Sequence, residues 1–131
     1  MATDDSSLLK RAEAMRDAAH ARYSGFRVGA ALVDEHGAVH VGCNVEDAAY
    51  PLGSCAEANA IAAMVAAGGS KIFRLLVVGG TEEPIACSPC GGCRQRIHEF
   101  ADSDTRVVYM TDDGEFVERT IAELLPGAFS L

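Results

Sequence analysis

The order of the predicted elements indicates an α/β sandwich built around a mixed β-sheet. Short apolar segments typical of strands alternate with longer segments that carry apolar residues at helical spacing. The chain has 131 residues, of which 49% are hydrophobic, and this is enough to enclose one core. A single domain over residues 1–131 is therefore expected.

The elements begin with an amphipathic helix in which Leu8, Ala12 and Met15 follow helical spacing. A turn at residues 34–37 joins two strands of a hairpin, and Gly68 and Gly69 end a second helix. The expected order is helix 6–22, strands 28–33 and 39–44, helix 55–67, strand 72–79, helix 89–101, strand 106–110, a short strand at 116–117 and a helical turn at 121–125.

This order predicts where a site would form. The strand over 39–44 leads into the helix that opens at Cys55, and the strand over 72–79 leads into the helix that opens near Cys90. If the two strands run in the same direction, both helices begin at one edge of the sheet. Ligands of open α/β sheets bind at such an edge.

Charge and hydropathy limit the partners. The formal net charge is −8, and lysine and arginine form no cluster of the kind that binds a nucleic-acid backbone. No apolar run approaches the roughly 20 residues of a membrane span, and no signal peptide is recognisable. We therefore expect a cytoplasmic protein that acts on a neutral small molecule and binds neither nucleic acid nor membrane.

The most informative motif combines three cysteines with one carboxylate. Glu57 follows Cys55 by two residues, and Cys90 and Cys93 form a Pro-Cys-x-x-Cys sequence further along. Zinc deaminases combine cysteine ligands with a glutamate that does not bind the metal. Three ligands leave one coordination position for water, and Glu57 would transfer the proton of that water to the substrate. The pattern predicts a zinc hydrolase that removes the amino group of a small base.

Charge balance constrains this site. Three thiolates on Zn²⁺ leave a net charge of about −1, which weakens the metal as a Lewis acid. Helix N-termini at both cysteine segments would offset part of this charge with their N–H groups and their dipoles.

Three other interpretations of the cysteines stay open. The Cys87-x-x-Cys90-x-x-Cys93 spacing resembles part of an iron–sulfur motif but lacks the final Cys-Pro. The last two cysteines alone could form a redox pair, and Cys43 or Cys87 could close a structural zinc site as a fourth ligand. None of these explains Glu57 in an otherwise apolar helix.

With these residues in view, the chain resembles cytidine deaminases of the small homotetrameric zinc-dependent type. The similarity extends over nearly the whole chain and is carried by residues 23–32, 42–50, 55–57, 89–95 and 123–129. It implies a three-layer α/β/α sandwich with a mixed five-stranded sheet. It also implies hydrolytic deamination of cytidine and deoxycytidine in pyrimidine salvage, by attack of zinc-bound hydroxide on C4, with one Zn²⁺ per subunit.

The resemblance assigns further residues by position. Cys55, Cys90 and Cys93 would bind zinc, and Glu57 would transfer protons. The family pattern implies that Phe26 lines the pocket and that Asn44 and Glu46 bind the ribose hydroxyls. Main-chain groups near Ala56 and Ser88 would contact the base. Phe129 would close over the base of a neighbouring subunit's site, and the loop at 48–50 would also cross a subunit interface.

One position departs from the family pattern. Many members carry arginine directly after the catalytic glutamate, whereas this chain has Ala58. The missing positive charge must then come from Arg94, from the helix dipoles or from a more distant arginine, and Arg94 is the first candidate. Two alternative functions remain: deamination of another cytosine nucleoside such as blasticidin S, and a metal-stabilised binding protein without turnover.

Overall fold

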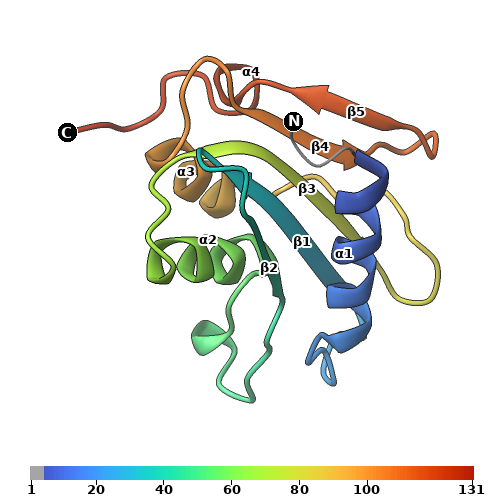
Figure 1. Ribbon diagram of the computed structural model, residues 1–131. Coiled ribbons are helices and arrows are strands. Elements are labelled where there is room, and N and C mark those ends of the chain that lie inside the picture. Colours follow the sequence, from blue (N-terminus) through green and yellow to red (C-terminus); the bar gives the residue numbers. More distant parts are fainter. Residues whose placement is uncertain (1–4) are drawn as a thin grey trace.

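The computed structural model describes residues 5–131, and its five strands form one mixed sheet in the order β2-β1-β3-β4-β5. Figure 1 shows the sheet with its helices. The elements are α1 Asp5–Ala18, β1 Arg27–Asp34, β2 Val39–Cys43, the 3-10 turn η1 Tyr50–Leu52, α2 Ala56–Ala66, β3 Ile72–Gly80, α3 Gly91–Glu99, β4 Arg106–Met110, β5 Phe116–Arg119 and α4 Ile121–Leu124.

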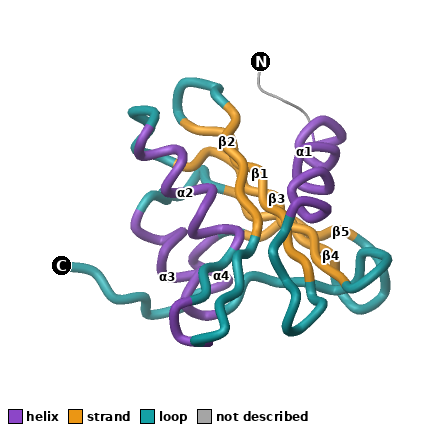
Figure 2. The backbone as a smooth tube through the Cα atoms, turned by 90° about the horizontal axis from the view of Figure 1, so that it is seen from below, coloured by secondary structure: helices purple, strands orange, loops and turns teal. Residues whose placement is uncertain are grey.

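Helices cover both faces of the sheet, which confirms the three-layer α/β/α sandwich. In Figure 2, α1 lies on one face, and α2, α3 and α4 lie on the other. Leu8 and Ala12 of α1 pack on Val33 and Val78 in the smaller core, and the larger core lies between the sheet and the other helices. Within residues 5–131, no helix is long and apolar enough to cross a bilayer.

The strand directions bring both metal-motif helices to the same edge. Strand β1 is antiparallel to β2 on one side and to β3 on the other, so β2 and β3 run in the same direction. Since α2 follows β2 and α3 follows β3, both helices begin at the same end of the sheet. The condition on which the sequence argument depended, that these two strands run in the same direction, is therefore met.

The far end of the β1–β2 hairpin is closed by one carboxylate. Asp34 is only 3% exposed and accepts hydrogen bonds from the main-chain N–H groups of His36 and Ala38, at 2.8 and 3.0 Å. His40 Nε2 lies 2.8 Å from its other oxygen. The turn is therefore held by contacts within the hairpin.

The predicted boundaries differ from the structure at two helices. The first helix ends at Ala18 because the next residues pair with the chain after β2: His20 N–H donates to Asn44 O and its carbonyl accepts from Glu46 N–H. The third helix begins at Gly91, with Cys90 as its N-cap, so Pro89 precedes the helix rather than opening it. Main-chain pairing over a long sequence separation explains the first difference.

Helix α2 is less enclosed than its composition suggests. Its inner face is buried, including Ala60 and Met64, but Ala62, Val65 and Ala66 on its outer face are exposed. A helix that is apolar nearly all round is expected to be buried on most sides, and this expectation is wrong for α2 in a single chain. An apolar outer face on an exposed helix is typical of a surface that another chain covers.

Gly42 permits the close contact between β2 and the first turn of α2. A Cβ added at Gly42 would lie 2.6 Å from Ala56 O and would also overlap Ala60 N. We expect Gly42→Ala to lower the free energy of unfolding by about 3 kcal/mol, because main-chain atoms would have to move. Urea denaturation measures this change. Gly91→Ala is the control, since its Cβ would meet nothing within 4 Å; equal stability of both variants would contradict the prediction.

Candidate active site

The two helices that begin at the sheet edge are both preceded by cysteine. Cys55 is the N-cap of α2 and Cys90 is the N-cap of α3, and both have extended backbone angles. An N-cap side chain usually accepts a hydrogen bond from the first turn, but neither cysteine does so. The Cys55 sulfur is therefore free of a capping bond, and the Cys90 sulfur has the main-chain N–H of Cys93 beside it.

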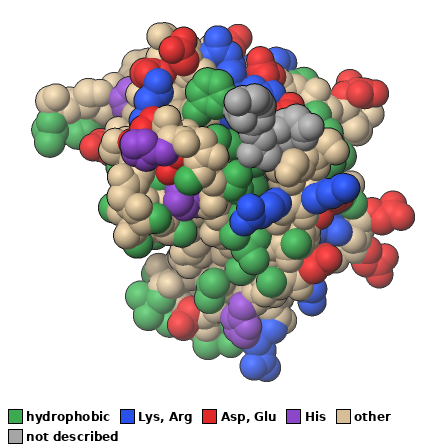
Figure 3. Space-filling model, viewed as in Figure 1, with side chains coloured by type: hydrophobic (Ala, Val, Ile, Leu, Met, Phe, Trp, Pro, Cys, Tyr) green, Lys and Arg blue, Asp and Glu red, His purple; other side chains and the backbone are tan. Residues whose placement is uncertain are grey.

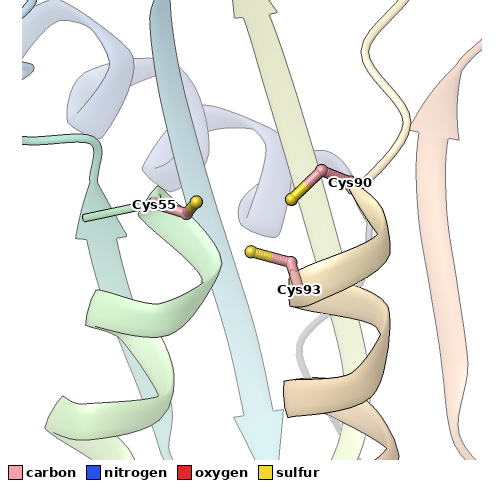
Figure 4. A group of neighbouring side chains, drawn as sticks. All are labelled: Cys55, Cys90 and Cys93. Carbon is pink, nitrogen blue, oxygen red and sulfur yellow. The ribbon is translucent and has the colours of Figure 1, made fainter. Parts of the chain in front are cut away.

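Three sulfur atoms meet at this edge. The Sγ atoms of Cys55, Cys90 and Cys93 all lie within 4.8 Å of one another, and Figure 4 shows them pointing into a common space between α2 and α3. Sulfur ligands on a tetrahedral zinc ion are roughly 3.8 Å apart, so a small contraction would suffice to bind one. Thiolates are soft ligands that suit zinc. The predicted ligand set is thus brought together.

The electrostatics of the cluster also favour a cation. Burial raises the pKa of the Cys55 and Cys93 thiols, whereas the main-chain N–H of Cys93 holds the pKa of Cys90 below its usual value. Three thiolates this close together would repel one another, so without a metal the thiols keep their protons. A bound cation offsets that repulsion and takes the place of the protons. Burial raises the pKa of Cys87 to about 12, so this cysteine stays a neutral thiol.

Glu57 lies in the first turn of α2 and is only 5% exposed. Burial raises the pKa of its carboxyl, and this rise is opposed by the main-chain N–H of Glu57, by the Cys93 thiol and, least, by the positive charge of Arg96. A buried carboxyl group beside three thiols is costly unless it serves a purpose. A raised pKa at the wall of a cleft is a property of general acid–base groups.

A cleft of about 330 Å³ opens beside the cluster. It brings together residues that the sequence places in five separate segments. Its lining consists of Phe26, Val28, Asn44, Val45, Glu46, Tyr50, Gly53, Ser54, Cys55, Ala56, Glu57, Cys87, Ser88 and Cys90. Every predicted substrate-binding residue except Phe129 therefore lines the same cleft as the catalytic candidate.

Asn44 and Glu46 are held in place by residues 23–28, which lie at the start of β1 and just before it. Asn44 Oδ1 accepts from Val28 N–H at 2.8 Å, and its Nδ2 donates to Phe26 O at 2.9 Å. Glu46 accepts from the main-chain N–H groups of Tyr23 and Ser24, and from the Ser24 hydroxyl. These bonds lower the pKa of Glu46, and the bond from the Ser24 hydroxyl has the largest effect. The carboxylate is therefore charged at neutral pH.

Two supporting residues were not predicted. Ser24 orients Glu46, and its hydroxyl also accepts from Phe26 N–H at 2.9 Å. Asn59 Nδ2 donates to Cys43 O at 2.7 Å and to Ser54 Oγ at 3.1 Å, which ties α2 to the end of β2. The sequence could have indicated a role for Asn59, because it is an amide among alanines in an apolar helix.

Phe129 lies away from the cleft of its own chain. It is 69% exposed, on the C-terminal segment that extends from the body in Figure 1. Two contacts hold this segment against α3: Gln95 Nε2 donates to Phe129 O at 3.0 Å, and His98 Nε2 lies 2.9 Å from Ser130 Oγ. Among the described residues, Phe129 does not line the cleft.

Arg94 does not take the role expected from the sequence. Its Nε donates to Pro89 O at 2.7 Å and its Nη1 donates to Leu124 O at 2.9 Å. These bonds tie the start of α3 to the end of α4. The guanidinium is thus occupied by carbonyl groups and does not bond the cysteine sulfurs.

The fold and this sheet-edge site together are those of a hydrolase of the deaminase class, with three cysteines placed to hold a metal ion. Residues 2–111 match the family model described as the cytidine and deoxycytidylate deaminase zinc-binding region. The cytidine deaminase of Sporosarcina psychrophila is 42% identical over 127 residues, which cover 97% of this chain and 92% of that protein.

Solved structures agree with this similarity. The cytidine deaminase of Burkholderia pseudomallei has a TM-score of 0.87 and 40% identity, covering 97% of this chain and all of the other. The enzyme of Mycobacterium tuberculosis has a TM-score of 0.85 and 34% identity, covering 98% and 99% of the two chains. The chain belongs to the cytidine and deoxycytidylate deaminase family.

Proposed function

We propose that the protein hydrolyses the exocyclic amino group of cytidine and deoxycytidine, which yields uridine or deoxyuridine and ammonia. One observation carries the proposal: buried Glu57 lines the same cleft as two of the three clustered cysteines and the polar residues Asn44 and Glu46. The names of the relatives described above support the choice of a cytosine nucleoside.

We propose that Cys55, Cys90 and Cys93 hold one Zn²⁺ per subunit. Their sulfur atoms are close enough for one ion, and the open cleft leaves space for water and substrate on one side. Bound zinc supplies Lewis acidity, which lowers the pKa of a coordinated water. Cys93 is fully buried, whereas Cys55 is half-buried and Cys90 is exposed, so solvent reaches the cluster on the side of the two cysteines that line the cleft.

Glu57 is proposed to transfer protons during the reaction. Its carboxylate accepts a proton from the attacking water and delivers it to the ring nitrogen. It then accepts the second proton from the hydroxyl now bonded to C4 and delivers it to the departing amine, as the C4–N bond breaks and the carbonyl forms. The oxygen of water replaces the amino nitrogen at C4, and ammonia leaves, so atoms and charge balance. The low exposure of Glu57 keeps these transfers away from bulk water.

The sugar end of the cleft favours a nucleoside over a nucleotide. Glu46 is charged at neutral pH and accepts hydrogen bonds from hydroxyl groups, whereas it would repel a phosphate. Asn44 retains one free amide hydrogen and one free lone pair after its two main-chain bonds, so it can bind a second hydroxyl. Phe26 would contact the apolar part of the nucleoside. Main-chain groups near Ala56 and Ser88 would contact the base.

We propose a homotetramer in which subunits share active sites. Tyr50 is 76% exposed, Leu52 73% and Phe129 69%, and these apolar side chains belong to loops rather than to the core. Together with the outer face of α2, they offer surfaces for neighbouring subunits. Phe129 would then reach the cleft of a neighbour, since it lies away from its own.

A charge on α2 tests the oligomer. We expect Val65→Glu to dissociate the tetramer, because it places a carboxylate in an apolar contact. Size-exclusion chromatography with light scattering measures the mass. Ala14→Glu adds the same charge to an exposed position of α1 and should leave the mass unchanged. A tetramer that survives in Val65→Glu would exclude α2 from the interface.

The function itself is tested by ammonia release from protein of measured zinc content. We expect turnover with cytidine and deoxycytidine, and little with their monophosphates, because of Glu46. Blasticidin S is the competing substrate, and relative kcat/KM decides between the two. Zinc-loaded protein that releases no ammonia from any of these would instead support a metal-stabilised binding protein.

The same proposal assigns a cellular role. A free nucleoside as substrate and a uracil nucleoside as product fit pyrimidine salvage in the cytoplasm. The five cysteines are free thiols, which suits a reducing compartment. On the face shown in Figure 3, lysine and arginine are interspersed with aspartate and glutamate, which supports a small-molecule substrate over a nucleic acid.

A further inference from the structure

A guanidinium group lies against the cysteine cluster from within α3. Arg96 follows Cys93 by three residues, so the two side chains share one face of the helix. Arg96 Nη1 lies 3.9 Å from Cys93 Sγ, within hydrogen-bond reach of sulfur. Among residues 5–131, this is the contact that joins a cationic side chain to a sulfur of the cluster.

Gly92 makes room for this contact. A Cβ added at Gly92 would lie 3.1 Å from Arg96 Nη1 and 4.0 Å from Cys90 Sγ. The guanidinium thus lies over bare main chain in the first turn of α3, beside the Cys93 sulfur. A side chain at this position would crowd the guanidinium, and the arginine head would have to shift by a few tenths of an ångström.

The charge at the site calls for such a group. Three thiolates with Zn²⁺ carry about −1, and the Glu57 carboxylate adds to it. Ala58 next to Glu57 carries no charge, and Arg94 is occupied by the carbonyls of Pro89 and Leu124. An N–H···S hydrogen bond from a cation draws electron density from the sulfur and reduces repulsion among the thiolates.

We propose that Arg96 is a positioning residue that offsets the surplus negative charge of the zinc–cysteine cluster through the Cys93 sulfur, in the space that Gly92 leaves. The inference rests on the proposed zinc site. It predicts that Arg96 increases zinc affinity and leaves the bound metal a stronger Lewis acid.

Zinc affinity provides the first test. Metal-free protein is titrated with zinc in competition with a chromophoric chelator. We expect Arg96→Gln to bind zinc about 10- to 100-fold more weakly, the range found when a partner of a metal ligand is removed. Arg96→Lys keeps the charge and should recover part of the loss. Gly92→Ala keeps Arg96 but displaces its head, and should weaken zinc binding as well.

A spectroscopic measurement separates this role from a structural one. Cobalt(II) in the site gives sulfur-to-metal charge-transfer bands, which should shift to longer wavelength in Arg96→Gln as the sulfur becomes more electron-rich. Arg11→Gln removes the same charge from an exposed position of α1 and should leave affinity and spectrum unchanged. Wild-type affinity in Arg96→Gln would overturn the inference, and so would weaker binding with an unshifted band. Wild-type protein that binds no zinc would overturn the proposed function as well.

Discussion

Replacing Glu57 by glutamine is expected to lower kcat for cytidine deamination by about 10²- to 10⁴-fold, the contribution typical of a general acid–base group. Glutamine keeps the shape of the side chain and its hydrogen-bonding capacity but cannot accept the proton of water at neutral pH. Because Glu57 belongs to the wall of the cleft and not to the sulfur cluster, the variant should still bind zinc. Substrate binding should change much less than turnover.

Three measurements on the same preparation check this expectation: ammonia release, zinc content and KM. Glu99→Gln is a matched control, because Glu99 is an exposed carboxylate at the end of α3. It should retain wild-type turnover. Full activity in Glu57→Gln would remove Glu57 from the reaction, whereas loss of zinc from that variant would make it a ligand rather than a proton carrier.

Replacing Cys93 by serine is expected to remove both zinc and activity. Cys93 is fully buried and its sulfur lies within 4.8 Å of those of Cys55 and Cys90. Serine offers a neutral hydroxyl, which is a poor ligand for zinc at neutral pH. Since metal binding and folding are coupled, the variant should also unfold at lower temperature than the zinc-loaded wild type.

Metal analysis and thermal unfolding of Cys93→Ser measure these effects. Cys43→Ala and Cys87→Ala serve as controls, because neither residue belongs to the cluster. Both should retain zinc. Release of zinc from Cys87→Ala would instead indicate a closed site with four cysteine ligands.

Treating the wild-type protein with a chelator should abolish turnover, and adding zinc afterwards should restore it.

Much of this fold could be predicted from local patterns. The apolar run at residues 75–78 identified the buried strand β3, and Gly68 and Gly69 identified the end of α2, where Gly68 adopts a φ of 96°. The end of α1 could not be predicted, since Ala19 and His20 continue its pattern. Pairing of His20 with the chain around Val45 decides that boundary, and the pairing depends on the assembled sheet.

In the site, too, some residues could be predicted from local patterns and others depend on tertiary contacts. Spacing and residue type identified the three cysteines and Glu57 before any geometry was known. The sequence did not reveal whether Arg94 or Arg96 contacts the cluster, because both follow Cys93 closely. The choice depends on tertiary contacts: the carbonyl of Leu124 binds Arg94, and the space at Gly92 admits Arg96. The hydrogen-bond partners of Glu46 could not be predicted from the sequence either, because Ser24 belongs to an irregular turn.

The hairpin turn closed by Asp34 has a practical consequence. It lies at the opposite end of β1 from Val28, which lines the cleft, and a strand of this length spans roughly 25 Å. His36 and Gly37 at its tip are exposed. An affinity tag, a fluorophore or an immobilising tether at His36 would therefore be remote from the reacting groups of its own chain.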